Sequence, residues 1–411
     1  MDPFSDPSDD AIREEELHLG DPPASRRSQL WKTALIVGII LIAAIGYGWA
    51  EGWFAPAPGK VPLTCTGDLN VTGEGSQLIS PLMSVWTTGF RAYSGCVQIS
   101  YQVDDGSAGL QALASRSIEF VASEAPLSPA QQAALPDPVV TVPVASGALA
   151  IIYHVPGVPA GLELSSTVLA EIFLGQITSW NSSAITALNP NMTFPAALPI
   201  TTVHGSGESG SNYVFTAYLS SVSPAWSERV GQGETVNWSV GTTANGSLAM
   251  EQAVENTSGA IGFVGLNVAE GGSASVARVQ NPAGNFITPT SASISAAFQD
   301  VPSNGLPLGN GDWSNVSELA APGPESYPIS TFSYVLIYED LGHAYGSDLT
   351  KNSAGWLATF LDWLVYYAQN YSASLHFAPL PPNIIAADVQ SLELLKYNGV
   401  SLLGDPDNDH D

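Results

Sequence analysis

The sequence predicts an α/β protein in which strands and helices alternate along most of the chain. Strand-like runs over 69–71, 97–103 and 118–122 each lead into a Gly-, Ser- or acid-containing turn, and helix-like segments follow the first two. The run 139–154 is almost continuously apolar near its end, which is typical of a strand buried on both faces. In such folds a ligand crevice lies at the carboxyl ends of the strands.

The first 64 residues differ in composition from this region and divide into three parts. Residues 1–30 are acidic and Pro-containing with no apolar period, and we expect a disordered cytosolic tail. Residues 31–50 contain the uncharged apolar run Thr33–Trp49, which is near the lower length limit for crossing a bilayer. Residues 51–64, with alternating Ala and Pro at 55–58, form a short stiff linker.

The charges that flank this run set its predicted orientation. Arg26, Arg27 and Lys32 precede it and Glu51 follows, so the positive-inside rule places the N-terminus in the cytoplasm. We expect a retained transmembrane signal-anchor, because no small-x-small cleavage pattern closely follows the run; a cleaved signal peptide is the alternative. The predicted location is therefore the cell membrane, single-pass, with the folded region extracytoplasmic.

The overall composition limits the classes of partner. The chain has 411 residues, is 45% hydrophobic and carries a net charge of −27, but only 12% of its residues are charged. Its polar surface must therefore consist mainly of Ser, Thr, Asn, Gln and Gly, which suits an acidic medium; a salt-rich habitat is the alternative. An acidic chain with 11 Lys and Arg residues is not a nucleic-acid binder.

Glycosylation sequons and cysteines lie only beyond the predicted anchor. Eight Asn-x-Ser/Thr sequons fit a glycosylated surface protein. They begin at Asn70, Asn181, Asn191, Asn237, Asn245, Asn256, Asn315 and Asn370. A disulfide between Cys65 and Cys96 would add roughly 3–4 kcal/mol, and two free buried thiols are the alternative. With only two Cys and scattered His residues, the sequence predicts no metal site.

The most informative stretch is 204–219 (HGSGESGSNYVFTAYL), which follows a strand-like run at 199–203. A strand, a Gly- and Ser-rich turn and a helix start together bring free backbone N–H groups and Ser hydroxyls to one point. The positive end of the helix dipole lies at the same point. The arrangement is therefore suited to binding an anion.

This stretch and several others resemble, in order, the extracytoplasmic phosphate-binding subunit of Pst-type ABC importers over roughly residues 65–400. The matching stretches are 73–86 (GEGSQLISPLMSVW), 101–109 (YQVDDGSAG), 118–128 (IEFVASEAPLS), 170–181 (AEIFLGQITSWN), 203–219, 258–264 (SGAIGFV), 327–338 (YPISTFSYVLIY) and 377–381 (FAPLP). The resemblance implies a two-lobed, hinged α/β fold of the periplasmic-binding-protein-like type II class. Lobe I would comprise 65–144 plus 327–411, and lobe II would comprise 145–326.

The resemblance also implies a ligand, inorganic phosphate, and partners, namely ABC permease subunits and a cytosolic ATPase. It implies neither a cofactor nor catalysis. Carried over by position, the phosphate-binding residues would be Ser76, Gln77, Leu78 (through its backbone N–H), Ser107, Glu124, Ser209, Gly210 and Ser211. Glu124 stands where the family usually has an Asp that accepts the ligand's proton, a contact that rejects sulfate.

The chain departs from the family pattern at the same site. Family members typically read HRSDGSGT where this chain reads HGSGESGS at 204–211, so Gly205 replaces the phosphate-contacting Arg and Gly207 its partner Asp. Gln77 replaces a hydroxyl residue. We expect the site, without a formal positive charge, to favour singly charged H2PO4−. The alternatives are another oxyanion, a phosphate ester or a site that no longer binds.

Other classes of function are less well supported. The pattern Gly205-x-Gly207-x-x-Gly210 matches a dinucleotide fingerprint, but no second strand ends in an acid some 20 residues on. A surface hydrolase would need a nucleophile such as Ser206 beside His204, without a G-x-S-x-G elbow. An adhesive protein that has kept the fold without the ligand is the third possibility.

Overall fold

A nine-stranded mixed sheet runs through the part of the chain that the computed structural model describes, residues 63–65, 69–104, 107–299, 301 and 305–403. The strands lie in the order β2-β1-β3-β12-β4-β8-β6-β7, and β9 pairs with β4. Their bounds are β1 Leu69–Gly75, β2 Val97–Val103, β3 Phe120–Ser123, β4 Val139–His154, β6 Thr201–Gly205, β7 Thr242–Ala244, β8 Ala260–Gly265, β9 Ser275–Val276 and β12 Ser330–Tyr338. The predicted α/β class is confirmed, with antiparallel pairs at the centre.

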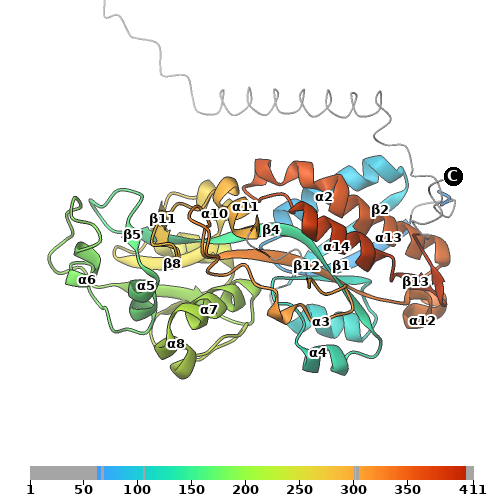
Figure 1. Cartoon of the computed structure of the whole chain (residues 1–411), viewed down its shortest axis with the longest axis horizontal. Helices are drawn as coiled ribbons and strands as arrows, with labels where there is room; N and C mark the ends of the chain where they lie inside the picture. The colour runs from blue at the N-terminus through green and yellow to red at the C-terminus, as the bar shows by residue number, and fades with distance from the viewer. Residues whose placement is uncertain (1–62, 66–68, 105–106, 300, 302–304, 404–411) are drawn as a thin grey trace, which may run out of the picture. The chain divides into compact units, whose positions relative to one another are not determined.

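Strand β4 changes partner halfway along its length. Up to Ala148 it pairs with β12, and from Leu149 it pairs with β8. All of its residues except His154 are buried, as its apolar sequence predicts. The parallel strands β1, β2 and β3 lie on one side of this change, and the parallel strands β6 and β7 lie beyond β8 on the other. We call these two halves lobe I and lobe II; in Figure 1, β4 runs between them.

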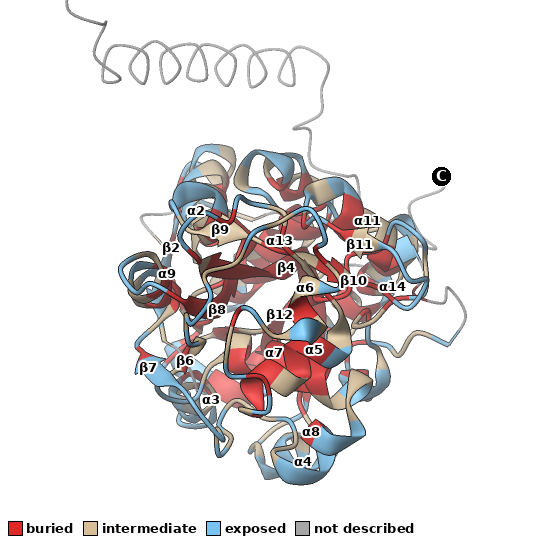
Figure 2. Cartoon of the chain, turned by 90° about the vertical axis from the view of Figure 1, so that its left-hand side faces the viewer, coloured by how far each residue is buried: buried red, intermediate tan, exposed pale blue. Residues whose placement is uncertain are grey.

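Helices cover both halves of the sheet. Lobe I carries α2 Ser80–Ser94, α3 Ser107–Ala114, α4 Pro129–Ala134, α12 Leu341–Tyr345, α13 Lys351–Tyr366 and α14 Pro382–Leu392. The helices on the lobe II side are α5 Ser166–Phe173, α6 Ser183–Thr186, α7 Gly210–Val222, α8 Pro224–Arg229, α9 Ser247–Glu255, α10 Leu266–Gly271 and α11 Ser291–Gln299. Figure 2 shows buried residues along the central strands and the inner faces of helices, with exposed residues on the outer faces.

Short elements complete the described structure. Two further small sheets and four 3-10 helices connect the larger elements. They are β5 Glu163–Leu164, β10 Arg278–Gln280, β11 Phe286–Ile287, β13 Lys396–Tyr397, β14 Val400–Ser401, η1 Trp313–Asn315, η2 Gly346–Asp348, η3 Ala368–Tyr371 and η4 Ala373–Leu375.

Aromatic side chains fill the core of each lobe. In lobe I the ring of Phe90 lies 5.0 Å from that of Phe360, measured between centroids. In lobe II, Phe215 stacks on Phe263 at 4.1 Å and contacts Phe173 at 4.7 Å. Complete burial of a side chain of this size contributes about 1.5–3 kcal/mol. The buried apolar residues of both halves belong to one hydrophobic cluster, which β4 shares.

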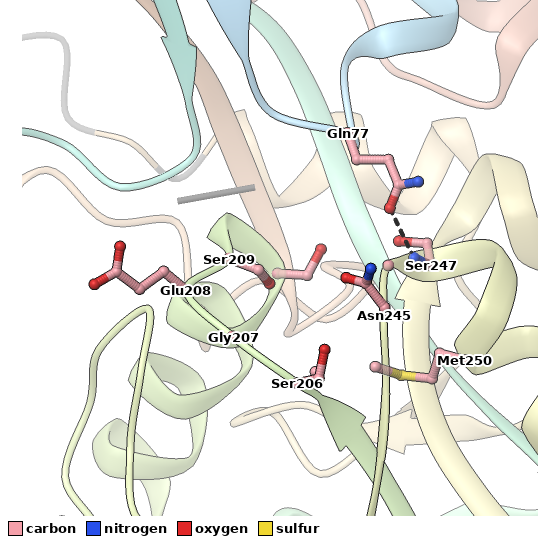
Figure 3. A pocket seen from close by; sticks show the side chains of 11 residues that line it. Gln77, Ser206, Gly207, Glu208, Ser209, Asn245, Ser247 and Met250 are labelled. Atoms are coloured by element: carbon pink, nitrogen blue, oxygen red, sulfur yellow. Dashed lines mark hydrogen bonds between the residues drawn. The ribbon is translucent and has the colours of Figure 1, made fainter. Parts of the chain in front are cut away.

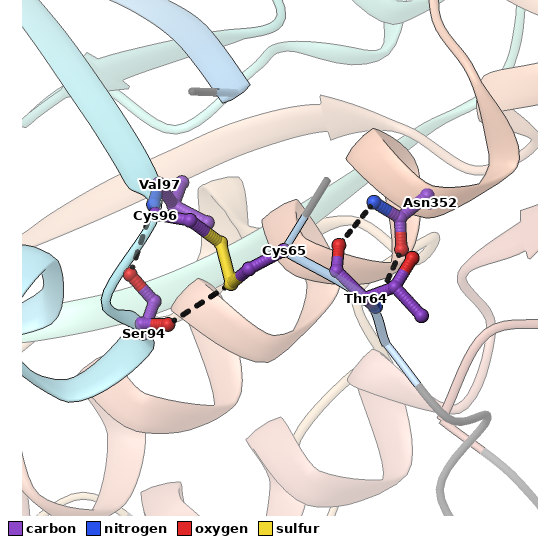
Figure 4. The surroundings of a disulfide bond; sticks show 6 residues. All are labelled: Thr64, Cys65, Ser94, Cys96, Val97 and Asn352. Atoms are coloured by element: carbon purple, nitrogen blue, oxygen red, sulfur yellow. Dashed lines mark hydrogen bonds between the residues drawn. A yellow bond between two sulfur atoms is a disulfide. The ribbon is translucent and has the colours of Figure 1, made fainter. Parts of the chain in front are cut away.

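A disulfide joins Cys65 to Cys96, as the sequence predicted, with the two Cα atoms 5.6 Å apart (Figure 4). Beside it, the backbone N–H of Thr64 donates to the Asn352 side chain at 3.1 Å, and the Asn352 amide donates back to the Thr64 carbonyl at 2.9 Å. The beginning of the described chain is thus linked to the end of α2 through the disulfide and to α13 through hydrogen bonds.

The predicted cytosolic tail and membrane anchor lie outside the described residues, as does the predicted linker up to residue 62. Within the described ranges, every helix falls short of the length and apolarity that a bilayer crossing requires.

Candidate functional site

Three loops that follow parallel strands meet between the lobes. Ser76 directly follows β1, Glu124 directly follows β3, and the Gly- and Ser-rich loop 206–209 connects β6 to α7. Parallel pairing of β1 with β3, in which Gly75 lies opposite Ala122, brings the first two together. The loops therefore meet at the carboxyl ends of the strands, where α/β folds bind ligands.

Glu124 is the buried acid at this point, with only 2% of its surface exposed. The Ser76 hydroxyl lies 2.6 Å from each of its carboxylate oxygens and donates to them. The Ser333 hydroxyl of β12 donates to Oε1 at 3.0 Å. Charge-assisted hydrogen bonds of this kind offset part of the cost of burying a carboxylate.

The N-terminus of α7 comes from lobe II and lies against this carboxylate. Gly210 is the first residue of the helix, and a Cβ there would overlap Glu124 Oε2. Ser209 is the N-cap, and its hydroxyl accepts a hydrogen bond from the backbone N–H of Asn212 at 3.1 Å. The positive end of the helix dipole therefore faces Glu124. A glycine is required at position 210 for the lobes to approach this closely.

The remaining predicted site residues divide between two neighbouring cavities. Ser76, Glu124 and Gly210 line a cavity of about 20 Å³, together with Asp104 and Glu234. Gln77, Ser209 and Ser211 line a second cavity of about 70 Å³ (Figure 3). The backbone N–H of Leu78 donates to the Ser76 hydroxyl at 3.0 Å. Ser107 begins α3, but its side chain lies outside the described residues.

The two cavities are acidic. Asp104, Glu124 and Glu234 line the first and Glu208 the second, whereas the described residues that line them include no Lys, Arg or His. Burial, and to a smaller extent the charge of Glu208, raise the pKa of Glu234. The site thus offers backbone dipoles, hydroxyls and carboxyls, and an anion bound there must itself bring protons to the carboxylates.

A neutral amide lies beside the position of the missing arginine. The Asn212 side chain accepts from the backbone N–H of Gly205 at 3.2 Å and donates to the carbonyl oxygens of Gly207 and Glu234 at 2.8 and 3.2 Å. A Cβ at Gly205 would lie 2.6 Å from Asn212 Oδ1. Asn212 therefore orders the loop through hydrogen bonds without charge, and a side chain at position 205 would have to displace it.

His204, the residue next to this loop, packs in the core of lobe II. Its ring stacks on Trp238 with centroids 4.4 Å apart, and its Nδ1 atom lies 3.2 Å from the Gly205 carbonyl oxygen. Burial lowers the pKa of His204. This packing is that of a structural residue at the end of a strand.

Sequence reasoning missed several residues of this site. Ser333 lies within the matched stretch 327–338, but no motif in the sequence marks it as a binding residue. Glu234 follows the Gly-rich segment 231–233, which is the one local feature that could have indicated it. Asn212 is a polar residue inside a helix, and no sequence motif distinguishes it. Each of them reaches the site only through tertiary packing. Within the described part of the chain, His, Cys, Asp and Glu form no group of three or more that could hold a metal ion.

Comparisons with known proteins show the family to which the chain belongs. The sequence profile of the PBP superfamily domain matches residues 61–366. The phosphate-binding protein PstS of Xylella fastidiosa (strain 9a5c) is 31% identical over 330 residues, which are 78% of this chain and 84% of that protein. PstS of Methanocaldococcus jannaschii is 27% identical over 380 residues, or 88% of this chain and 94% of that protein.

Solved structures share the fold. A high-affinity periplasmic phosphate-binding protein bound with phosphate at pH 8.5 has a TM-score of 0.62 at 20% identity, covering 82% of this chain and 100% of the other. A phosphate-binding protein from Stenotrophomonas maltophilia has a TM-score of 0.60 at 17% identity, covering 82% and 99%. On the profile match and the sequence relatives together, this chain belongs to the Pst-type phosphate-binding proteins of the PBP superfamily.

Proposed function

We propose that this protein is the extracytoplasmic substrate-binding subunit of an ABC importer, which captures inorganic phosphate between its lobes and delivers it to a permease. The observation that carries the proposal is the approach of Glu124 in lobe I to the N-terminus of α7 in lobe II. Phosphate bound there would accept hydrogen bonds from the α7 backbone and donate its own proton to the carboxylate. Membership of a phosphate-binding family supports the same ligand.

The proposed ligand form is H2PO4−, which carries one charge and two protons. Three carboxyls line the smaller cavity and Glu208 lies nearby, with no described cation among the lining residues. Doubly charged HPO4²⁻ would meet uncompensated repulsion from these carboxylates, whereas H2PO4− has a proton for each of two of them. The proposed binding residues are Ser76, the Leu78 backbone, Ser107, Glu124, Ser209, Gly210 and Ser211, with Gln77 beside them.

Lobe boundaries and cellular setting complete the proposal. Lobe I comprises 65–144 plus 327–411, and lobe II comprises 145–326. Residues 31–50 hold the protein in the membrane with the binding unit outside, near its permease and the cytosolic ATPase. The Cys65–Cys96 disulfide and the exposure of all eight sequon asparagines are compatible with an oxidising, glycosylating compartment. We also propose that the protein has no catalytic activity.

Calorimetric titration of residues 58–411, which form one compact unit, tests the ligand. We expect micromolar or tighter phosphate binding that is stronger at pH 3 and 5 than at pH 7 and is not displaced by sulfate. Affinity that rises steadily up to pH 8 would refute the choice of H2PO4−. Complete absence of phosphate binding at every pH would refute the ligand itself, and a panel of oxyanions and phosphate esters would then identify its replacement.

A further inference from the structure

Helix α9 of lobe II begins without a cap of its own. Its N-cap residue is Gly246, which has no side chain to accept a hydrogen bond from the first turn and adopts a left-handed φ of 81°. By contrast, the N-cap residues of α5, α7 and α13 are Ser165, Ser209 and Thr350, whose hydroxyls accept hydrogen bonds from the first turns of their own helices. An uncapped first turn leaves backbone N–H groups without a helical partner.

Lobe I supplies the missing cap. The side-chain oxygen of Gln77 accepts a hydrogen bond from the backbone N–H of Ser247, the first residue of α9, at 2.7 Å (Figure 3). The two residues are 170 positions apart in the sequence. Ser247 is buried, so water is a poor substitute partner for its N–H.

The close fit at Gly246 shows why both residues are needed. A Cβ at position 246 would lie 2.7 Å from Gln77 Oε1 and 3.1 Å from its Nε2. Gly246 therefore serves two purposes, because it permits the positive φ and leaves room for the amide of the opposite lobe.

We infer that Gln77 is a latch between the lobes, which caps α9 in the closed state and releases it when the lobes separate. The inference rests on the proposed function in that closure encloses the ligand. In this role Gln77 holds the lobes together. Its side chain is longer than the hydroxyl residue that the family usually has at this position, and is long enough to cross the cleft. The latch lowers the rate of lobe opening and so the rate of ligand release.

Two substitutions separate a latch from a ligand contact. Gln77→Met keeps the length of the side chain but removes the acceptor, so we expect dissociation of phosphate to be roughly fivefold faster, the size of effect that loss of a helix cap produces. Gln77→Glu keeps an acceptor oxygen at the helix N-terminus, where a carboxylate is favourable. A latch therefore survives Gln77→Glu, whereas a residue that donates to the anion would lose phosphate binding.

Hydrogen–deuterium exchange of the peptide that contains Ser247 reports on the latch directly. At pH 5 with phosphate, we expect its amide to be protected in the wild type and in Gln77→Glu and to exchange freely in Gln77→Met. Gln98→Ala, an exposed glutamine of β2, is the matched control and should leave exchange and dissociation unchanged. Circular dichroism melting confirms that each variant is folded.

The two proposals fail in different ways. Protection of Ser247 that does not depend on residue 77 would overturn the latch, whatever the ligand. If the wild type binds no phosphate and yet Ser247 is protected only when residue 77 has an acceptor, then the latch is upheld and the ligand assignment is wrong.

Discussion

Gly210 and Glu124 come from opposite lobes and lie in direct contact, with the carboxylate occupying the space that a Cβ at position 210 would need. The contact joins the anion-binding end of a helix to the acid that we propose as the proton acceptor. Because it forms only when the lobes are together, the size of residue 210 determines whether the site can close.

Gly210→Ala should therefore abolish tight phosphate binding. The added methyl group forces α7 and Glu124 apart, and we expect affinity to fall at least 100-fold, while the protein still folds with a melting temperature lowered by the overpacked contact. Calorimetry and thermal melting measure the two quantities. Gly271→Ala is the control, since a Cβ there meets nothing within 4 Å. Full affinity in Gly210→Ala would show that this contact is not part of the binding state.

Glu124→Gln should weaken phosphate binding and reduce the preference for phosphate over sulfate. The amide can donate to an unprotonated anion but is a poorer acceptor for the ligand's proton. We expect a loss of roughly tenfold or more for phosphate and detectable competition by sulfate. Competition calorimetry measures both, with Glu325→Gln at an exposed position as the control. Unchanged sulfate exclusion would indicate that another group selects the ligand.

Glu318 makes the fold more stable in acid. It is 5% exposed, accepts a hydrogen bond from the Phe332 backbone N–H at 2.7 Å, and burial raises its pKa to about 8. Burial, and to a smaller extent the charge of Glu318, raise the pKa values of Tyr213 and Tyr334. Glu124 lines the same cavity. A carboxyl with a raised pKa in the folded state contributes fully at low pH, and its contribution falls as the pH rises from about 4.5 to about 8.

Glu318→Gln should remove this dependence. The pKa difference corresponds to about 5 kcal/mol of stability lost across that interval, as an order of magnitude. The variant should therefore unfold at a higher urea concentration than the wild type at pH 8, with a smaller difference at pH 4. Burial also raises the pKa of Asp388 well above its ordinary range, so some acid stabilisation remains. Parallel urea curves for the two proteins at all pH values would contradict the assignment.

Elements that depend on local sequence patterns can be predicted from the sequence, whereas contacts between residues far apart in the chain cannot. Val97–Val103 and Val139–His154 were predicted with the bounds that the structure has, because their patterns are local. The strand predicted at 199–203 runs over 201–205, since pairing with β7 and β8 sets its ends. Contacts such as Ser333–Glu124 and Gln77–Ser247 join residues 209 and 170 positions apart, and no local pattern encodes them.

The disulfide should provide a measurable part of the stability. Its two residues are separated by 31 positions, and loss of such a cross-link costs roughly 3–4 kcal/mol by chain entropy. We expect Cys65→Ser/Cys96→Ser to unfold at a clearly lower urea concentration than the wild type, with the wild type in reductant behaving like the variant. Added reductant should not affect the double variant, which serves as the control. Equal midpoints for both proteins would mean that the pairing adds no stability.

Restoring a positive charge should shift the pH dependence of binding. A Cβ at position 205 would lie 2.6 Å from Asn212 Oδ1 and would displace that side chain, so Gly205→Arg is combined with Asn212→Ser to make room. At pH 7, Gly205→Arg/Asn212→Ser should bind phosphate at least tenfold more tightly than Gly205→Gln/Asn212→Ser, which makes a similar steric change without the charge. The advantage should grow from pH 4 to pH 8, because the ligand gains a second negative charge over that range and its attraction to Arg increases in proportion. Calorimetry of both double variants across this range measures the ratio of affinities. A ratio that does not change with pH would mean that the missing cation does not cause the preference for binding in acid. The carboxyls at Glu208 and Glu234 would then be the remaining cause of that preference.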